Sequence, residues 1–204
     1  MKLYYSPGAC SLSPHIALLE ADLPYELVKV DIRAKKLENG DDYLTINPKG
    51  QVPALGLDDG EIVTEGPVIV QVIADKAPAK ALAPARDSSA RYKLLEWLNF
   101  LTSEVHKSFG PLFAPALNDD AKAFFRDRVM GKLKHIDSEL AGRDYLMGKQ
   151  FTVADGYLFT MLTWGDRMKF DLSAMPNLTA YKARVAARPK VQEALTKEGL
   201  AQAA

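Results

Sequence analysis

The sequence predicts a small α/β domain followed by an all-α helical bundle. Strand-like runs occur only in the first part of the 204-residue chain, where they alternate with helical patterns. The Ala- and Pro-rich stretch "APAKALAPARDSS" comes next, and only helical periodicity follows it. We therefore predict a first domain at residues 1–77, a linker at 78–87 and an all-helical domain at 88–204.

The first domain has the element order strand, helix, strand, connection, strand, strand and helix. The connection contains "DDYLTINP", and the turn Asp58-Asp59-Gly60 separates the last two strands. Such an order gives a small open sheet that helices can cover. The predicted strands are 2–5, 25–31, 52–57 and 61–64, and the predicted helices are 11–21 and 67–76.

The second domain shows helical patterns only. Its first pattern, "SARYKLLEWLNFLTSEVHKSF", is long and strongly apolar, and the next, "DDAKAFFRDRVMGKLKHIDSELAG", is amphipathic. Thr152 followed three positions later by Asp155 is a variant of the capping box in which a shorter acid replaces Glu. The predicted helices are 89–109, 119–142, 154–168 and 178–187.

Composition and charge favour a small ligand. Lys plus Arg and Asp plus Glu number 26 each, a balance that indicates neither nucleic acid nor a membrane surface as a partner. One cysteine cannot form an internal disulfide, and three scattered histidines lack zinc-ligand spacing, so we expect no metal. "LYYSPG" lacks the apolar core of a signal peptide, and no window approaches the roughly 20 apolar residues of a membrane span. We expect a cytoplasmic protein.

The only cysteine, Cys10, stands at the entrance to the first predicted helix. If this helix starts near Ser11, Pro14 lies in its first turn, where a missing N–H costs little. The free amides and the positive end of the helix dipole then stabilise a thiolate, either its own or that of a bound thiol. The alternative is a small buried hydrophobic residue, and position alone does not decide between the two.

Two corners of the first domain carry a proline. The bond Val52-Pro53 enters a short strand and is either cis, as in tight turns, or an ordinary trans bond. The corner Glu65-Gly66-Pro67 joins a strand to a helix, and its exposed amides suit a carboxylate ligand. A plain helix start made with Gly and Pro is the alternative there.

A polar stripe crosses the apolar run 89–109. Asn99, Ser103 and His106 recur at steps of four and three, which places them on one face of a helix. Polar groups in such a setting need partners, and either an interhelical network or a ligand can supply them.

Taken together, these segments resemble a bacterial beta-class glutathione S-transferase. The resemblance rests on "YYSPGACSLSPHIAL", "NPKGQVPAL", "TEGPVIVQVIAD", "NFLTSEVHKSF" and "FTVADGYLF", in order and at the family's spacing. It implies a thioredoxin-like domain that binds glutathione, an all-α domain that contributes the electrophile site, and a homodimer. Glutathione is then a co-substrate, and the resemblance implies no separate cofactor.

The resemblance also assigns roles in the first domain. The cysteine matching Cys10 lies beside the glutathione sulfur and can form a mixed disulfide with it. The valine matching Val52 precedes a cis-proline, Pro53, and pairs its backbone with the cysteinyl part of the tripeptide. Glu65 is implied to face the γ-glutamyl ammonium, and Gly66 its carboxylate. The commoner residue at Gly66 is serine, so one hydrogen bond on the order of 1 kcal/mol is missing.

Further roles follow from the same resemblance. Lys35 matches the position that binds the glycyl carboxylate, although the residues alone indicate a solvated charge run shared with Lys36. His106 is implied to lie near the sulfur, Asn99 to reach the glutathione of the other subunit, and Lys107 to adjoin the electrophile site. The implied catalytic residues are Cys10, His106 and Lys107, and the implied glutathione-binding residues are Cys10, Ser11, Lys35, Val52, Pro53, Glu65, Gly66, Asn99, Ser103 and His106.

Some residues have competing interpretations. Other classes of the family stabilise the thiolate with Tyr or Ser, so Tyr5, Ser6 and Ser11 compete for this role. Ser11 ranks first because it lies at the helix start, where it is equally suited to be an N-cap. We interpret His15 as helix packing and His135 as a surface residue. The candidates for an apolar cavity, which are equally plausible core residues, are Leu112, Phe113, Tyr157 and Trp164.

We therefore expect a glutathione transferase that conjugates the glutathione thiolate to small hydrophobic electrophiles, in detoxification or aromatic-compound catabolism. One alternative makes Cys10 the nucleophile of a glutathione-dependent thiol–disulfide oxidoreductase, peroxidase or dehalogenase. Another is a non-catalytic module that binds glutathione or another ligand.

Overall fold

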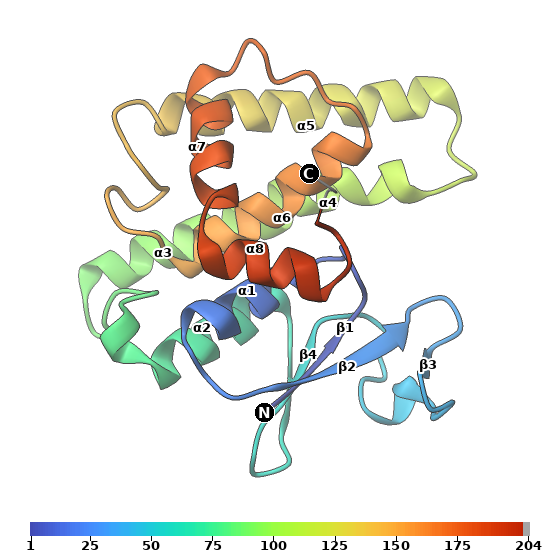
Figure 1. Ribbon diagram of the computed structural model, residues 1–204. Coiled ribbons are helices and arrows are strands. Elements are labelled where there is room, and N and C mark those ends of the chain that lie inside the picture. Colours follow the sequence, from blue (N-terminus) through green and yellow to red (C-terminus); the bar gives the residue numbers. More distant parts are fainter. Residues whose placement is uncertain (202–204) are drawn as a thin grey trace.

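A five-stranded mixed sheet lies at one end of the computed structural model, which describes residues 1–201 (Figure 1). The strand order is β3-β2-β1-β4-β5, in which only β1 and β2 run parallel. Residues 202–204, the end of the predicted helical domain, lie outside the described residues. The strands are β1 (Lys2–Tyr5), β2 (Glu26–Asp31), β3 (Lys36–Leu37), β4 (Ala54–Gly56) and β5 (Ile62–Thr64).

Helices α1 (Leu12–Glu20) and α2 (Gly66–Lys76) lie between the sheet and the second group of helices (Figure 1). The residues of α1 from 12 to 19 are all buried, because this helix packs against α2 as well as against helices of the second group. A helix that is buried all round must be apolar on most of its faces, as "LSPHIALL" largely is. The fold is that of a thioredoxin-like domain joined to an all-α domain.

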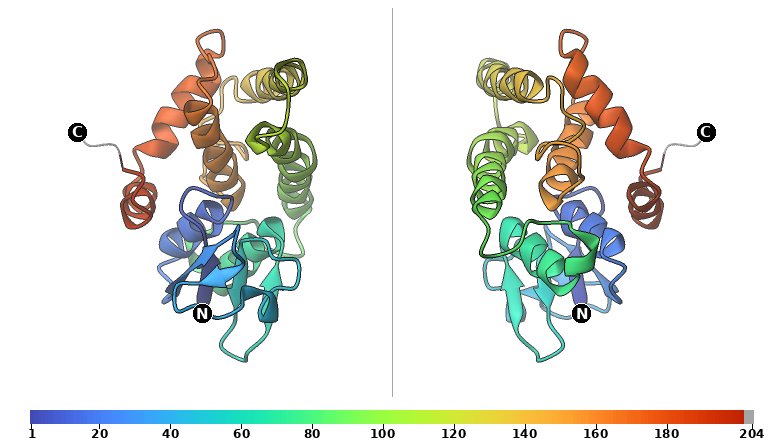
Figure 2. Two further views of the ribbon diagram at one scale, coloured as in Figure 1. Left: turned by 90° about the vertical axis from the view of Figure 1, so that its right-hand side faces the viewer. Right: turned by 90° about the vertical axis from the view of Figure 1, so that its left-hand side faces the viewer.

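The second group consists of helices alone, and its last helix returns to the first domain. Figure 2 shows α8 beside α1, and these two helices are in contact. Among the described residues no helix combines the length and the apolar character needed to cross a membrane. The helices are α3 (Ser89–Phe100), α4 (Lys107–Phe109), α5 (Asp119–Glu139), α6 (Val153–Arg167), α7 (Pro176–Ala186) and α8 (Pro189–Lys197).

Most predicted elements of the first domain are confirmed within two residues, with two informative differences. The short strand β3 lies in the segment predicted as a connection. The strand predicted from residue 52 begins only at Ala54, because Pro53 has no N–H to donate to a neighbouring strand.

The long helix predicted at 89–109 is not a continuous α-helix. Between α3 and α4 the chain forms a π-helical turn, Leu101–His106. In a π-helix the hydrogen bonds span five residues rather than four, so the side chains that follow are rotated relative to an α-helical pattern. This rotation changes which residues face the first domain.

The predicted capping box begins helix α6. The Thr152 N–H donates to the Asp155 carboxylate at 2.7 Å, and the Leu146 N–H donates to the same side chain at 2.9 Å. The hydroxyls of Thr152 and Tyr181 each add a further bond at 3.0 Å. Burial raises the pKa of Asp155 to about 6, and these donors limit the rise.

Candidate active site

A cleft of about 310 Å³ lies between the two domains. Six segments line it: the loop that follows β1, the loop between β2 and β3, the segment at 47–53, the corner at 64–67 where α2 begins, the long helix at 102–107, and α6 at Tyr157. The residues that line the cleft include Cys10, Lys35, Lys49, Val52, Pro53, Glu65, Gly66, Thr102, His106, Lys107 and Tyr157.

Cys10 is held as a neutral thiol. Its Sγ donates to the carbonyl oxygen of Val52 at 3.0 Å. Burial raises the pKa of the thiol to about 11, while the N–H groups of Cys10 and Ser11 and the charge of Lys107 act in the opposite direction. Among the alternatives that the sequence leaves open at this position, desolvation thus favours the neutral thiol for Cys10 itself, because it outweighs the amides.

The competing hydroxyls of the first loop do not line this cleft. The Ser11 hydroxyl is fully buried, accepts from the Ser6 N–H at 3.1 Å and lies 3.2 Å from the Ser6 carbonyl oxygen. Ser11 is therefore neither a side-chain N-cap nor a group whose hydroxyl faces the cleft, contrary to both interpretations of it. Tyr5 is buried in the core.

The bond between Val52 and Pro53 is cis, as the resemblance implies. The carbonyl of the preceding residue, Gln51, accepts from the Tyr43 hydroxyl at 2.8 Å and from the Asn47 amide at 2.7 Å. These two buried side chains fix the segment that leads into the cis bond.

The corner before α2 has an unusual backbone. Glu65 adopts a φ of 69°, in the region that favours glycine, and its carbonyl accepts from the N–H of Val68 and of Ile69. The first N–H groups of a helix have no intrahelical partner, so the Gly66 amide is suited to an anion. The Glu65 carboxylate pairs with Lys49 at 2.6 Å.

Lys49 is a cleft residue that the sequence analysis missed. It lies in the turn "NPKG" just before the cis-proline segment, and this position could have identified it as a candidate binding residue. The two candidate lysines Lys35 and Lys36 are separated by the fold. Lys35 lines the cleft and donates to the Gly50 carbonyl at 2.7 Å, whereas Lys36 is exposed in β3.

The predicted polar stripe is divided by the π-helical turn. Thr102, His106 and Lys107 line the cleft. Ser103 is exposed, and its hydroxyl donates to the Asn99 carbonyl at 3.0 Å, so its placement beside His106 is wrong. The error comes from α-helical spacing applied across a π-turn. Asn99 instead lines an adjacent groove between α2 and α3.

His106 is a neutral imidazole. Its Nδ1 lies 2.7 Å from the Tyr157 hydroxyl, and its ring packs against Trp164 with centroids 4.9 Å apart. Burial lowers the pKa of His106 to about 4, and the nearby charge of Lys107 acts in the same direction. Burial also raises the pKa of Tyr157, so this hydroxyl keeps its proton.

The four candidates for an apolar cavity have different positions. Tyr157 lines the cleft and Trp164 is buried behind His106. Phe113 is 51% exposed, and the edge-on contact of its ring with Trp164 has centroids 5.4 Å apart. Leu112 is partly buried against the core.

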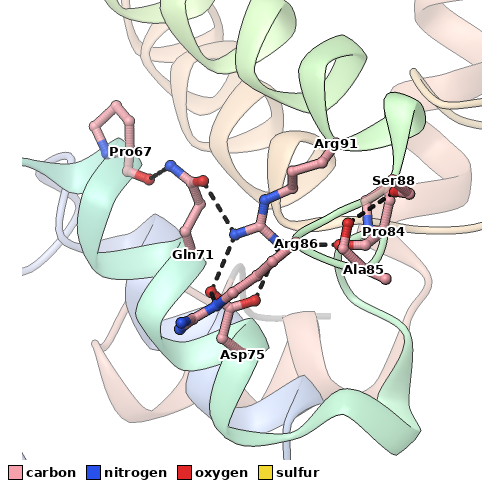
Figure 3. A network of polar contacts seen from close by, with 8 residues as sticks. All are labelled: Pro67, Gln71, Asp75, Pro84, Ala85, Arg86, Ser88 and Arg91. Carbon is pink, nitrogen blue, oxygen red and sulfur yellow. Dashed lines mark hydrogen bonds and ion pairs between the residues drawn. The ribbon is translucent and has the colours of Figure 1, made fainter.

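A buried ion pair joins the two helices that border the cleft (Figure 3). Arg91 of α3 bonds both carboxylate oxygens of Asp75 in α2, at 3.0 and 3.1 Å. The same guanidinium donates to Gln71 at 3.1 Å and to the Pro84 carbonyl at 3.0 Å. Because Arg91 of α3 donates to two side chains of α2, Asp75 and Gln71, this network fixes α2 relative to the long helix.

The side chains described in residues 1–201 include no group of three or more that could hold a metal ion. The arrangement that they do form combines a thiol beside a cis-proline, a free helix N-terminus and a helical domain that closes the cleft. Together, a thioredoxin-like fold and such a site define a glutathione transferase.

Comparison with known families agrees with this class. The family model for the glutathione S-transferase N-terminal domain matches residues 8–76, and that for the C-terminal domain matches residues 94–189. The chain belongs to the glutathione S-transferase family, in its beta class.

Individual relatives are similar over nearly the whole chain. Glutathione S-transferase GstA of Escherichia coli O157:H7 is 47% identical, over 98% of this chain and 100% of the relative. A sphingomonad glutathione S-transferase solved in complex with glutathione is 54% identical, with a TM-score of 0.95 over 98% of this chain and 100% of the other. The beta-class enzyme of Sphingomonas chungbukensis is 51% identical, with a TM-score of 0.95 and the same two coverages.

Proposed function

We propose that this chain binds glutathione in the interdomain cleft and directs its thiolate at a small hydrophobic electrophile. The observation that carries the proposal is the convergence of four groups on one cleft. They are the Cys10 thiol, the cis Val52-Pro53 segment, the first turn of α2 and the neutral His106 imidazole. The glutathione complex of the sphingomonad relative supports this choice of ligand.

Glutathione would lie along the edge of the first domain. Its cysteinyl backbone pairs with Val52, as an added strand does, and its γ-glutamyl carboxylate accepts from the Gly66 amide. Its γ-glutamyl ammonium faces Glu65, which then exchanges its contact with Lys49 for one with the ligand. Lys35 binds the glycyl carboxylate, as its place in the cleft allows.

The sulfur would be stabilised by neutral donors and one cation. The Tyr157 hydroxyl lies 2.7 Å from Nδ1 of His106 and 3.4 Å from the Thr102 hydroxyl, so we assign its proton to the shorter contact, with Nδ1. Nε2 then carries the imidazole proton and can donate to the sulfur anion. Lys107 adds a positive charge at the same end of the cleft.

The reaction itself needs no group beyond the thiolate. Glutathione releases its thiol proton to solvent, and the sulfur lone pair forms a C–S bond to the electrophile. In a substitution the leaving group departs with the electron pair of its own bond. In an addition the π-electron pair of the attacked double bond moves onto the acceptor, which is then protonated. Positioning and charge stabilisation by the cleft lower the barrier.

A glutathione-dependent thiol–disulfide oxidoreductase with Cys10 as nucleophile is the second candidate. Its supporting observation is that Sγ reaches the Val52 carbonyl, where the cysteinyl part of the ligand would pair. The raised pKa of Cys10 disfavours it, because the thiol is then rarely ionised at neutral pH.

Two measurements test these alternatives. Calorimetry of glutathione binding near pH 7 must show a saturable site, and its absence contradicts the whole proposal. Conjugation of an aromatic halide and exchange with a glutathione mixed disulfide are then compared in wild type and Cys10→Ala. We expect Cys10→Ala to keep most of the conjugation rate. Loss of both activities makes Cys10 the nucleophile.

We also propose a homodimer, in which Asn99 reaches the glutathione of the partner subunit. Its support is the exposure of large apolar side chains on the two helices that form the groove at Asn99: Tyr92 and Leu95 of α3 and Val68 of α2 are 74%, 37% and 46% exposed, and Leu95 lines this groove with Asn99. Sedimentation velocity should give about twice the 22.4 kDa chain mass, and Leu95→Lys should give the monomer. A wild-type monomer would contradict this arrangement.

A further inference from the structure

The loop that carries Cys10 is held by two buried side chains of the helical domain. The N–H of Gly8, two residues before Cys10, donates to Oε2 of Glu198 at 2.8 Å. The carbonyl of Gly8 accepts from the indole Nε1–H of Trp164 at 2.9 Å. Both backbone groups of one residue are therefore fixed by side chains that lie 190 and 156 positions away in the sequence.

Glu198 is itself held rigidly. Its second oxygen, Oε1, lies 2.8 Å from Nδ1 of His15 in α1, and Nε2 of His15 lies 3.0 Å from the Tyr25 hydroxyl. The side chains of Glu198 and His15 are both fully buried. A carboxylate that uses both oxygens inside the protein has one favoured orientation, so it can act as a fixed point for the loop.

The backbone at Gly8 favours glycine. Its φ is 67°, and a Cβ added there would lie 2.1 Å from the guanidinium of Arg167, which would have to move. The other hydrogen bonds of the loop stay within the first domain, such as the Ala9 N–H to the Ser6 carbonyl at 3.0 Å and the Cys10 Sγ to the Val52 carbonyl at 3.0 Å. The Gly8 contacts are thus the loop's hydrogen bonds to the second domain.

Trp164 connects the loop to a second cleft residue. The indole that binds the Gly8 carbonyl also packs on the ring of His106, with centroids 4.9 Å apart. One buried ring therefore sets the distance between the loop of Cys10 and the imidazole that faces it across the cleft.

We propose that Glu198 and Trp164 are positioning residues for the transferase reaction, acting through the Gly8 peptide. The inference rests on the proposed function, because it concerns the placement of the glutathione sulfur between Cys10 and His106. Neither residue lines the cleft, so their loss should affect sulfur geometry rather than glutathione binding. Small displacements of reacting atoms are costly in rate, on the order of 100-fold per ångström.

The test compares Glu198→Ala with Glu198→Gln and Val191→Ala. Glu198→Gln keeps an oxygen that accepts from the Gly8 N–H. Val191→Ala truncates a fully buried side chain of helix α8, which ends just before Glu198, and this side chain has no group that can hydrogen-bond to Gly8, so it controls for lost packing. Steady-state kinetics, hydrogen exchange of residues 6–11 and the alkylation rate of Cys10 are measured on all three.

We expect Glu198→Ala to lower kcat by about 10-fold while KM for glutathione changes less than about twofold. The Gly8 amide should lose its exchange protection, and the alkylation rate of Cys10 should change. Glu198→Gln and Val191→Ala should stay within about threefold of the wild-type kcat. Trp164→Phe, which keeps a ring against His106 but loses the donor, should also lower kcat selectively.

Three outcomes overturn the inference. The first is equal loss of kcat in Glu198→Ala and Val191→Ala. The second is a Gly8 amide that exchanges freely in wild type, and the third is a Glu198→Ala variant that loses Gly8 protection with unchanged kcat and unchanged Cys10 alkylation. A wild type that conjugates nothing contradicts the proposed function instead, and exchange and alkylation then still decide whether Glu198 positions the loop.

Discussion

The thiol of Cys10 should react more slowly at neutral pH than an ordinary cysteine. Burial raises its pKa from 9.0 to about 11. At pH 7 this lowers the thiolate fraction by about 100-fold. A thiolate of higher pKa is the better nucleophile, and over two pKa units this raises the rate constant of the thiolate by about 6- to 10-fold. The net rate of alkylation at pH 7 should therefore be about 10- to 16-fold lower.

The assay is alkylation by iodoacetamide between pH 6 and pH 10. The chain has one cysteine, so the rate belongs to Cys10 alone. We expect the rate of the folded protein to rise throughout this range, whereas the chain unfolded in guanidinium chloride levels off near the ordinary pKa. Lys107→Met should slow the folded protein further, because the Lys107 charge lowers the pKa of Cys10. A plateau at or below pH 9 in the folded protein refutes the reasoning.

The remaining predictions concern the supporting contacts. The ring protons of His106 should titrate near pH 4 in an NMR experiment. Because this pKa lies below the ordinary 6.5, the contribution of His106 lowers the free energy of unfolding as the pH falls from about 6.5 to about 4. Tyr157→Phe should lower kcat about fivefold, the equivalent of one hydrogen bond of about 1 kcal/mol, and an unchanged kcat would contradict the role of its hydroxyl. In urea unfolding, Asp155→Ala should cost about 3 kcal/mol by leaving buried donors unpaired. Arg91→Leu should cost about 1–2 kcal/mol, because the Gln71 and Pro84 oxygens lose a donor while Asp75 keeps its ion pair with Arg86, and an unchanged free energy of unfolding would contradict this.

Local sequence patterns were sufficient for most of the fold. Alternating apolar residues marked the strands, helical spacing marked the helices, and Thr152 with Asp155 marked the start of α6. These features depend on residues close together in the chain, which is why they can be predicted from sequence. Positions such as Val52-Pro53 and Glu65 were found because turns and helix starts have distinctive residue types.

Several features of the site could not be predicted in this way. α-Helical spacing grouped Ser103 with His106, but the π-turn brings Thr102 and Lys107 to the cleft instead. The pairing of Lys49 with Glu65 joins two segments 16 residues apart. Such contacts depend on how separate elements meet.

The sequence by itself thus determined the order of strands and helices, the cysteine at a helix entrance and the membership of a family. Only the tertiary structure decided the state of that cysteine, because its pKa depends on burial and on the Val52 carbonyl. It also decided that Glu198 holds the Gly8 peptide. The physical reason is that desolvation and long-range hydrogen bonds are set by which surfaces pack together, and no local pattern contains that information.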